Sequence, residues 1–189
     1  MKMKTYTELY QMILLEHEKV FAAQDTGALD NAMEEIASAK RIFVTGAGRE
    51  GIAARGFAMR LMHLGKEVHW LWDDTTPGMK AGDLFIAVNG SGCIGHIDYL
   101  LDKAGETCAR RLVITGAPNE RTPSEAEAVL FVPAMVYKGK DSRTVPSKQP
   151  MGNLFEQHLF LLFDLLAMML TGHLHETHET MEKRHRNIE

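Results

Sequence analysis

Hydrophobic residues recur at three- and four-residue spacing from Tyr6 to about Ser38, a pattern typical of amphipathic helices. Gly27 interrupts this stretch, so it predicts either one long helix or two. The period changes at residue 40, where the short apolar run 41–45, "RIFVT", ends at a glycine and is typical of a buried strand. A helix is predicted to follow from about 49 to 64, with Gly65 at its C′ position.

The alternation of strands and helices continues along the chain. The pattern predicts further strands at 67–72, 83–88, 111–115 and 128–132. A turn at Pro77 and Gly78, a helix ending near 104 and a short helical turn at 123–126 separate them. Five short apolar runs, most of them separated by helices, predict an α/β fold with a parallel sheet covered on both faces.

The last part of the chain loses this regularity and then becomes strongly apolar. Residues 134–150 gather Lys138, Lys140, Arg143 and Lys148, and they form either a solvated loop or one that faces a ligand. An apolar helix is predicted from 153 to about 170, stopped by Gly172, and then a polar helix from 175 or 176 to the end. Because the first of these helices is apolar nearly all round, it must be buried on more than one side, which favours an oligomer.

Composition and charge narrow the class of protein. The 189 residues fit one domain, with a helical segment at 1–39, an α/β core at 40–133 and C-terminal helices at 151–189. A net charge of -4 supplies no basic field for nucleic acid or anionic lipid, so small molecules are the expected partners. The longest apolar run, 159–170, is interpreted as a buried helix because it is too short to span a membrane. Two cysteines and no apolar signal-peptide region predict a reducing, cytoplasmic location.

A glycine-rich loop follows the first predicted strand. Gly46, Gly48 and Gly51 have the spacing G-x-G-x-x-G, and backbone amides at such a strand end and helix start can hold a phosphate. Asp73 and Asp74 partly meet the further requirement of a dinucleotide site for an acid about 20 residues on. A second loop of small residues, 88–92, closes a neighbouring strand. Two such loops suit a compact sugar phosphate better than a dinucleotide, which remains the alternative.

Several longer segments resemble one family. "RIFVTGAGREG", "GFAMRLMHLG", "TTPGMKAGDLFIAVNGSG", "PMGNLFE" and "MEKRHRNIE" are similar, in order and in register, to the 6-phospho-3-hexuloisomerases of the sugar isomerase (SIS) superfamily. The resemblance covers residues 40–189. It implies a five-stranded parallel sheet of flavodoxin-like order, a homotetramer, and sugar isomerisation through a cis-enediol without a metal or nucleotide cofactor.

The resemblance also implies roles for individual residues. Glu156 matches the base that moves a proton between neighbouring carbons, although a carboxylate there also simply favours the start of a helix. His63 and His185 match acid or shuttle groups; His63 serves a neighbouring subunit's site in one interpretation, and His185 requires the terminal helix to fold over a pocket. The substrate-binding residues implied are Gly46, Gly48, Arg49, Glu50 and Gly51 in the first loop, and Asn89, Gly90, Ser91, Gly92 and Cys93 in the second.

The chain departs from the family pattern at the phosphate-binding loops. Glu50 stands where the family usually has serine, and a carboxylate repels a phosphate bound to the same amides. The second loop reads N-G-S-G-C-I where S-G-S-G-E-T is usual. The cation that could compensate is Arg49, Lys138, Lys140 or Arg143. Three hypotheses follow: a hexulose phosphate isomerase with a weaker phosphate grip, an isomerase of a different sugar, or a non-catalytic sugar-phosphate sensor.

One other histidine cluster could suggest a metal site. His173, His175, His178 and Glu179 lie close in the sequence, with two histidines that could share a helix face. A metal site needs three or four converging ligands. We therefore predict an exposed polar helix here and no metal.

Overall fold

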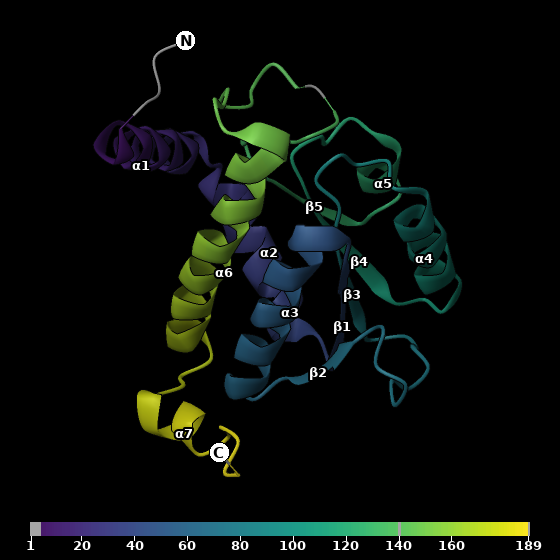
Figure 1. Cartoon of the computed structure of the whole chain (residues 1–189). Coiled ribbons are helices and arrows are strands. Elements are labelled where there is room, and N and C mark those ends of the chain that lie inside the picture. The colour runs from purple at the N-terminus through teal and green to yellow at the C-terminus, as the bar shows by residue number, and fades with distance from the viewer. Residues whose placement is uncertain (1–4, 140, 189) are drawn as a thin grey trace.

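The computed structural model describes residues 5–139 and 141–188 (Figure 1). Two helices come first, and strands then alternate with helices until a long loop leads into the last helices. In chain order the elements are α1 (Tyr6–Ala23), α2 (Thr26–Ser38), β1 (Arg41–Gly46), α3 (Gly48–His63), β2 (Glu67–Trp70), β3 (Leu84–Val88), α4 (Gly95–Glu106), β4 (Arg110–Thr115), α5 (Arg121–Ser124), β5 (Ala128–Phe131), the 3-10 turn η1 (Pro150–Gly152), α6 (Asn153–His173) and α7 (His178–Glu182).

The sheet has five strands in the order β2-β1-β3-β4-β5, and every neighbouring pair is parallel. Strand order reverses between β1 and β3, so the carboxyl ends of these two strands flank the point where ligands bind in open α/β sheets. The predicted α/β fold with flavodoxin-like strand order is confirmed.

Helices cover both faces of the sheet. Ile42 and Val44 of β1 pack in a core with α2, α3 and α6 on one face, whereas Phe43 packs with α4 on the other. This alternation follows from the two-residue period of a strand. Figure 1 shows α3 and α6 side by side, and α4 to the right of the strands, away from α3 and α6.

The two N-terminal helices separate at a polar cap and not at Gly27. The Asp25 carboxylate accepts hydrogen bonds from the backbone N–H groups of Gly27 (2.8 Å) and Ala28 (3.3 Å), so it caps the start of α2. Gly27 therefore lies in the first turn of α2. Of the two alternatives, one long helix or two, the structure has two, and the break precedes Gly27.

The C-terminal helices differ from their predicted limits. Helix α6 continues through Gly172 to His173, and His175, with φ 54°, takes the left-handed conformation beyond it. Helix α7 spans only His178–Glu182 and does not reach the end of the chain. No residue of α7 is buried, so apolar packing does not extend the helix further.

Helix α6 is longer than its apolar run suggested. Together with η1 it forms a stretch of 24 residues, which is long and apolar enough to cross a membrane by length and composition. The prediction that this segment is too short to span a membrane was therefore wrong. Half of its apolar window is buried inside the protein, and the rings of Phe57 in α3 and Phe163 in α6 stack with centroids 4.5 Å apart. Helix α6 therefore packs against α3, while Phe160, Leu161 and Met168 on it stay exposed.

Candidate active site

A cleft of about 380 Å³ opens at the carboxyl ends of β1 and β3. We call it the strand-end cleft. The start of α3, the loop after β3, the loop 134–152 and the start of α6 enclose it. Its lining residues are Arg49, Glu50, Ser91, Ile94, Tyr137, Lys138, Met151 and Glu156. The two loops singled out in the sequence therefore meet at one site.

The glycines of the first loop bring α3 against the end of β1. A Cβ atom on Gly51 would lie 2.5 Å from the carbonyl oxygen of Gly46, so only glycine permits this close approach. Gly48 has φ 54°, a left-handed conformation that glycine adopts without strain. These glycines position the backbone, and the following Arg49 and Glu50 present their side chains to the cleft.

Glu156 lies in the first turn of α6, and its side chain is only 18% exposed. Its Oε2 atom is 2.8 Å from Nη1 of Arg49, in an ion pair, and Arg49 also donates a hydrogen bond to Oδ1 of Asn153. The same Oε2 atom is buried and has no hydrogen-bond partner among the described residues. A carboxylate held beside a cation with unused lone pairs can accept a proton from a bound ligand.

A second carboxylate, that of Glu50, lies in the same cleft. Its Oε2 atom accepts a hydrogen bond of 2.8 Å from the backbone N–H of Gly90, the second residue of the loop after β3. Burial raises the pKa of Glu50 to about 7. The Gly90 hydrogen bond opposes this rise, and the charge of Glu156 adds to it. A Cβ atom on Gly90 would lie 2.3 Å from Oε1 of Glu50 and 2.8 Å from Cε1 of the buried Phe155 ring, so a larger residue here would displace one or both side chains.

In the second loop, Asn89 organises the backbone and does not line the cleft. It is fully buried; its amide donates to Oγ1 of Thr122 (2.7 Å) and its side-chain oxygen accepts from the N–H of Gly92 (3.1 Å). Ser91 lines the cleft, whereas the exposed Cys93 does not and Ile94 does. The sequence showed that this loop closes a strand, but it could not show which side chains turn inward.

The loop 134–152 contributes residues that sequence reasoning largely missed. Lys138 lines the cleft, as one of the proposed compensating cations, and Tyr137 and Met151 join it. Met151 is left-handed with φ 57°, and a Cβ atom on the next residue, Gly152, would lie 2.5 Å from the N atom of Tyr137. The only sequence signal for this turn was the motif P-M-G at 150–152.

Of the other two candidate cations, Arg143 does not line the cleft. Arg143 pairs with Asp141 at 2.7 Å and lies over the ring of Phe131. Lys140 lies outside the described residues. Among the described residues, Arg49 and Lys138 are the cations that line the strand-end cleft.

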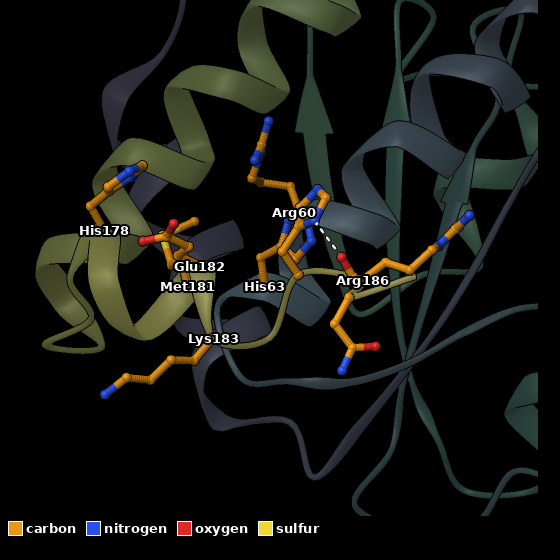
Figure 2. A pocket seen from close by; sticks show the side chains of 9 residues that line it. Arg60, His63, His178, Met181, Glu182, Lys183 and Arg186 are labelled. Atoms are coloured by element: carbon orange, nitrogen blue, oxygen red, sulfur yellow. Dashed lines mark hydrogen bonds between the residues drawn. The ribbon is translucent and has the colours of Figure 1, made fainter. Parts of the chain in front are cut away.

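His63 and His185 line a different cleft, of about 600 Å³, at the C-terminal end of α3 (Figure 2). We call it the helix-end cleft. The two imidazole rings stack with centroids 5.2 Å apart, and Arg184 fixes the terminal segment by donating to the carbonyl oxygen of His63 at 2.9 Å. Burial lowers the pKa of His63, and the charges of Arg60 and His185 lower it further. Arg60, His178, Lys183 and Arg186 make this cleft mainly basic, with Glu182 as an acidic member.

The two clefts lie at opposite ends of α3. His63 is thirteen positions after Glu50 in this helix, which corresponds to about 20 Å at the rise of an α-helix. Within one chain the structure therefore brings Glu156 together with Arg49 and Glu50, but not with His63 or His185. In residues 5–139 and 141–188, no group of three or more histidine, cysteine, aspartate or glutamate side chains is arranged to hold a metal ion.

Comparisons with known proteins agree with this architecture. The SIS domain matches residues 35–139. A 3-hexulose-6-phosphate isomerase of Mycobacterium gastri is 37% identical over 82% of this chain and 77% of its own, and one of Bacillus subtilis is 34% identical over 99% and 100%. A solved structure from Methanococcus jannaschii, from which a function of 3-hexulose-6-phosphate isomerase was inferred, superposes with a TM-score of 0.83, 26% identity and coverage of 96% and 99%. The chain belongs to the SIS domain family, within the group of the 3-hexulose-6-phosphate isomerases.

Proposed function

We propose that the chain is a sugar-phosphate isomerase that interconverts 3-hexulose 6-phosphate and fructose 6-phosphate through a cis-enediol. The observation that carries this proposal is the geometry of Glu156. Its Oε2 atom is buried in a cleft at the strand ends, beside the Arg49 guanidinium and without a hydrogen bond from any described residue. The relatives named as 3-hexulose-6-phosphate isomerases supply the substrate class.

The reaction moves a carbonyl from C3 to C2 of the sugar. Glu156 removes the proton from C2, the electron pair forms the C2–C3 double bond, and the former carbonyl oxygen on C3 takes up a proton. The hydroxyl on C2 then loses its proton as the new carbonyl forms, and Glu156 returns its proton to C3. Arg49 stabilises the negative charge that develops on the oxygens.

His63 and His185 enter this scheme through a neighbouring subunit. We propose a homotetramer in which the helix-end cleft of one chain completes the strand-end cleft of another. Two features support it: the two imidazoles lie about 20 Å from Glu50 along α3, and large apolar side chains of α3 and α6 are exposed. The exposed side chains are Ile52, Met59, Met62, Phe160, Leu161 and Met168. Large apolar side chains exposed on two helices that pack together favour a contact with another subunit.

Mixing two inactive variants tests the shared site. Glu156→Gln and His63→Asn each remove one half of the site, and co-folded mixed oligomers regain about a quarter of the wild-type sites if the two halves come from different subunits. His173→Asn, on an exposed imidazole of α6, is the matched control and stays active by itself. Light scattering gives the oligomeric state. A mixture as inactive as its components would contradict sites shared between subunits.

We also propose that the protein works in the cytoplasm. Cys93 and Cys108 are both free and exposed, which suits a reducing compartment. Fractionation of cells that express the tagged full-length chain tests this location, and recovery in a secreted fraction would contradict it.

A further inference from the structure

Two helices each bring a carboxyl group to the strand-end cleft. Glu50 lies in the first turn of α3 and Glu156 in the first turn of α6, and both line the cleft. Moving a carbonyl between C3 and C2 requires one proton transfer between the carbons and another between their oxygens. Glu156 accounts for the transfer between the carbons, so the oxygens need an acid–base group of their own.

The two carboxyl groups lie in different electrostatic environments. Glu156 forms an ion pair with the Arg49 guanidinium at 2.8 Å. Glu50 has no ion pair among the described residues, and its Oε2 atom accepts a hydrogen bond of 2.8 Å from the backbone N–H of Gly90. Burial raises the pKa of Glu50 to about 7, and the charge of Glu156 adds to the rise. Two carboxyl groups in such unlike environments are typical of an acid and a base that act in one reaction.

On the basis of the isomerase function proposed above, we propose that Glu50 is a second catalytic residue, which moves the proton between the oxygens on C3 and C2 while Glu156 moves the proton between the carbons. Protonated Glu50 donates its proton to the carbonyl oxygen on C3 as Glu156 takes the proton from C2. The Glu50 carboxylate then accepts the proton of the C2 hydroxyl as the new carbonyl forms and Glu156 returns its proton to C3. Both glutamates end in the state in which they began.

This role is compatible with a phosphorylated substrate. A protonated Glu50 carries no charge to repel the phosphate. Lys138 lines the same cleft, has no ion pair among the described residues, and can bind the phosphate end. His63 and His185 lie in the helix-end cleft, so a neighbouring subunit's histidines are left to close the strand-end cleft over the substrate.

The titratable and charged groups that line the cleft with Glu50 come from three elements: Arg49 of α3, Glu156 of α6, and Tyr137 and Lys138 of the loop 134–152. The loop after β3 adds Ser91 and Ile94, which carry no charge, and the thiol of Cys93 is exposed outside the lining. In either direction of the reaction, the carbonyl oxygen must first receive a proton from Glu50. Ionisation of Glu50 removes that proton, so kcat/KM should fall as the pH rises above about 7.

Glu50→Gln tests this role, because it keeps the size of the side chain and cannot transfer a proton. Conversion of fructose 6-phosphate by the full-length protein gives kcat and KM across the neutral and alkaline range. Glu50→Asp keeps a carboxyl group. Glu106→Gln, on an exposed carboxylate of α4, removes the same charge elsewhere and should match the wild type. Thermal unfolding shows that the variants fold.

The expected result is a loss in kcat of at least about 100-fold in Glu50→Gln, with KM changed by less than about threefold, since general acid–base catalysis contributes about 10²–10⁴-fold. The fall of kcat/KM above about pH 7 should disappear in this variant, and Glu50→Asp should regain at least about tenfold in kcat. The proposal is overturned by a smaller loss, by a loss in KM alone, by a fall above about pH 7 that persists in Glu50→Gln, or by no recovery in Glu50→Asp. The isomerase function fails separately, if the wild type exchanges no carbon-bound proton in any ketose phosphate.

Discussion

Replacing Gly51 by alanine should destabilise the protein and misplace its active site. The new Cβ atom would lie 2.5 Å from the carbonyl oxygen of Gly46 and 2.9 Å from its carbonyl carbon, where ordinary contact begins at 3.4 Å. Both neighbours are backbone atoms of β1, so α3 must move by almost 1 Å. Overpacking of this kind costs about 1–3 kcal/mol, and the gain in helix propensity offsets about 1 kcal/mol of it. We expect a net loss of up to about 2 kcal/mol.

Gly172 of α6 offers the matched control. A Cβ atom there meets nothing within 4 Å, so Gly172→Ala should keep or raise stability by up to about 1 kcal/mol. Thermal unfolding at one fixed protein concentration compares the two, and the loss in Gly51→Ala corresponds to a fall of up to about 8 °C in Tm. Because Arg49 and Glu50 move with the start of α3, isomerisation should also slow at least about tenfold in Gly51→Ala only. If Gly51→Ala unfolds at the same temperature as Gly172→Ala, the reasoning from close backbone approach is refuted.

Three further changes test other parts of the site and its support. Glu16→Ala removes a buried carboxylate that accepts hydrogen bonds from each of residues 147–149. The loop 134–152 should then loosen over the strand-end cleft, so kcat/KM should fall at least about fivefold. Unchanged kinetics would show that the loop does not need these hydrogen bonds. Burial, with the charge of a neighbouring histidine, lowers the pKa of His158 to about 4, below the unfolded value of about 6.5. The contribution of neutral His158 to the free energy of unfolding should therefore be fully present above about pH 6.5 and fall by as much as about 3 kcal/mol towards pH 4. In urea titrations, His158→Phe should remove this pH dependence. Arg49→Met should lower kcat at least about tenfold, because the developing oxyanion loses its cation, while Arg143→Met, whose guanidinium pairs outside the cleft, should not; equal losses would contradict the assignment of Arg49.

The fold could be predicted because buried strands carry a strong local signal. Runs such as 42–44 and 84–88 are apolar throughout, as is typical of strands covered on both faces. The ends of strands and helices were harder to predict where strand pairing or packing determines them. The edge strand β2 ends at Trp70, after its last pairing with Val44, although the apolar pattern continues to Trp72.

The site was only partly predictable, since the direction of loop side chains depends on tertiary contacts. The sequence pointed to Glu156, Arg49 and Glu50, and the structure places all three in one cleft. It could not show that Asn89 turns inward to meet Thr122, which lies 33 residues later in the chain. Nor could it show the contact between Glu50 and Gly90, because that contact depends on two strand ends lying side by side.

Proton exchange at carbon tests the central claim most directly. Fructose 6-phosphate incubated with the full-length protein in deuterated water should lose its C3 proton signal in proton NMR spectra, because Glu156 exchanges the abstracted proton with solvent. Glu156→Gln should abolish this exchange, and Glu106→Gln should retain it. The account is contradicted if the wild type exchanges no proton, if exchange occurs at C1 alone, as in an aldose–ketose isomerase, or if Glu156→Gln exchanges as fast as wild type.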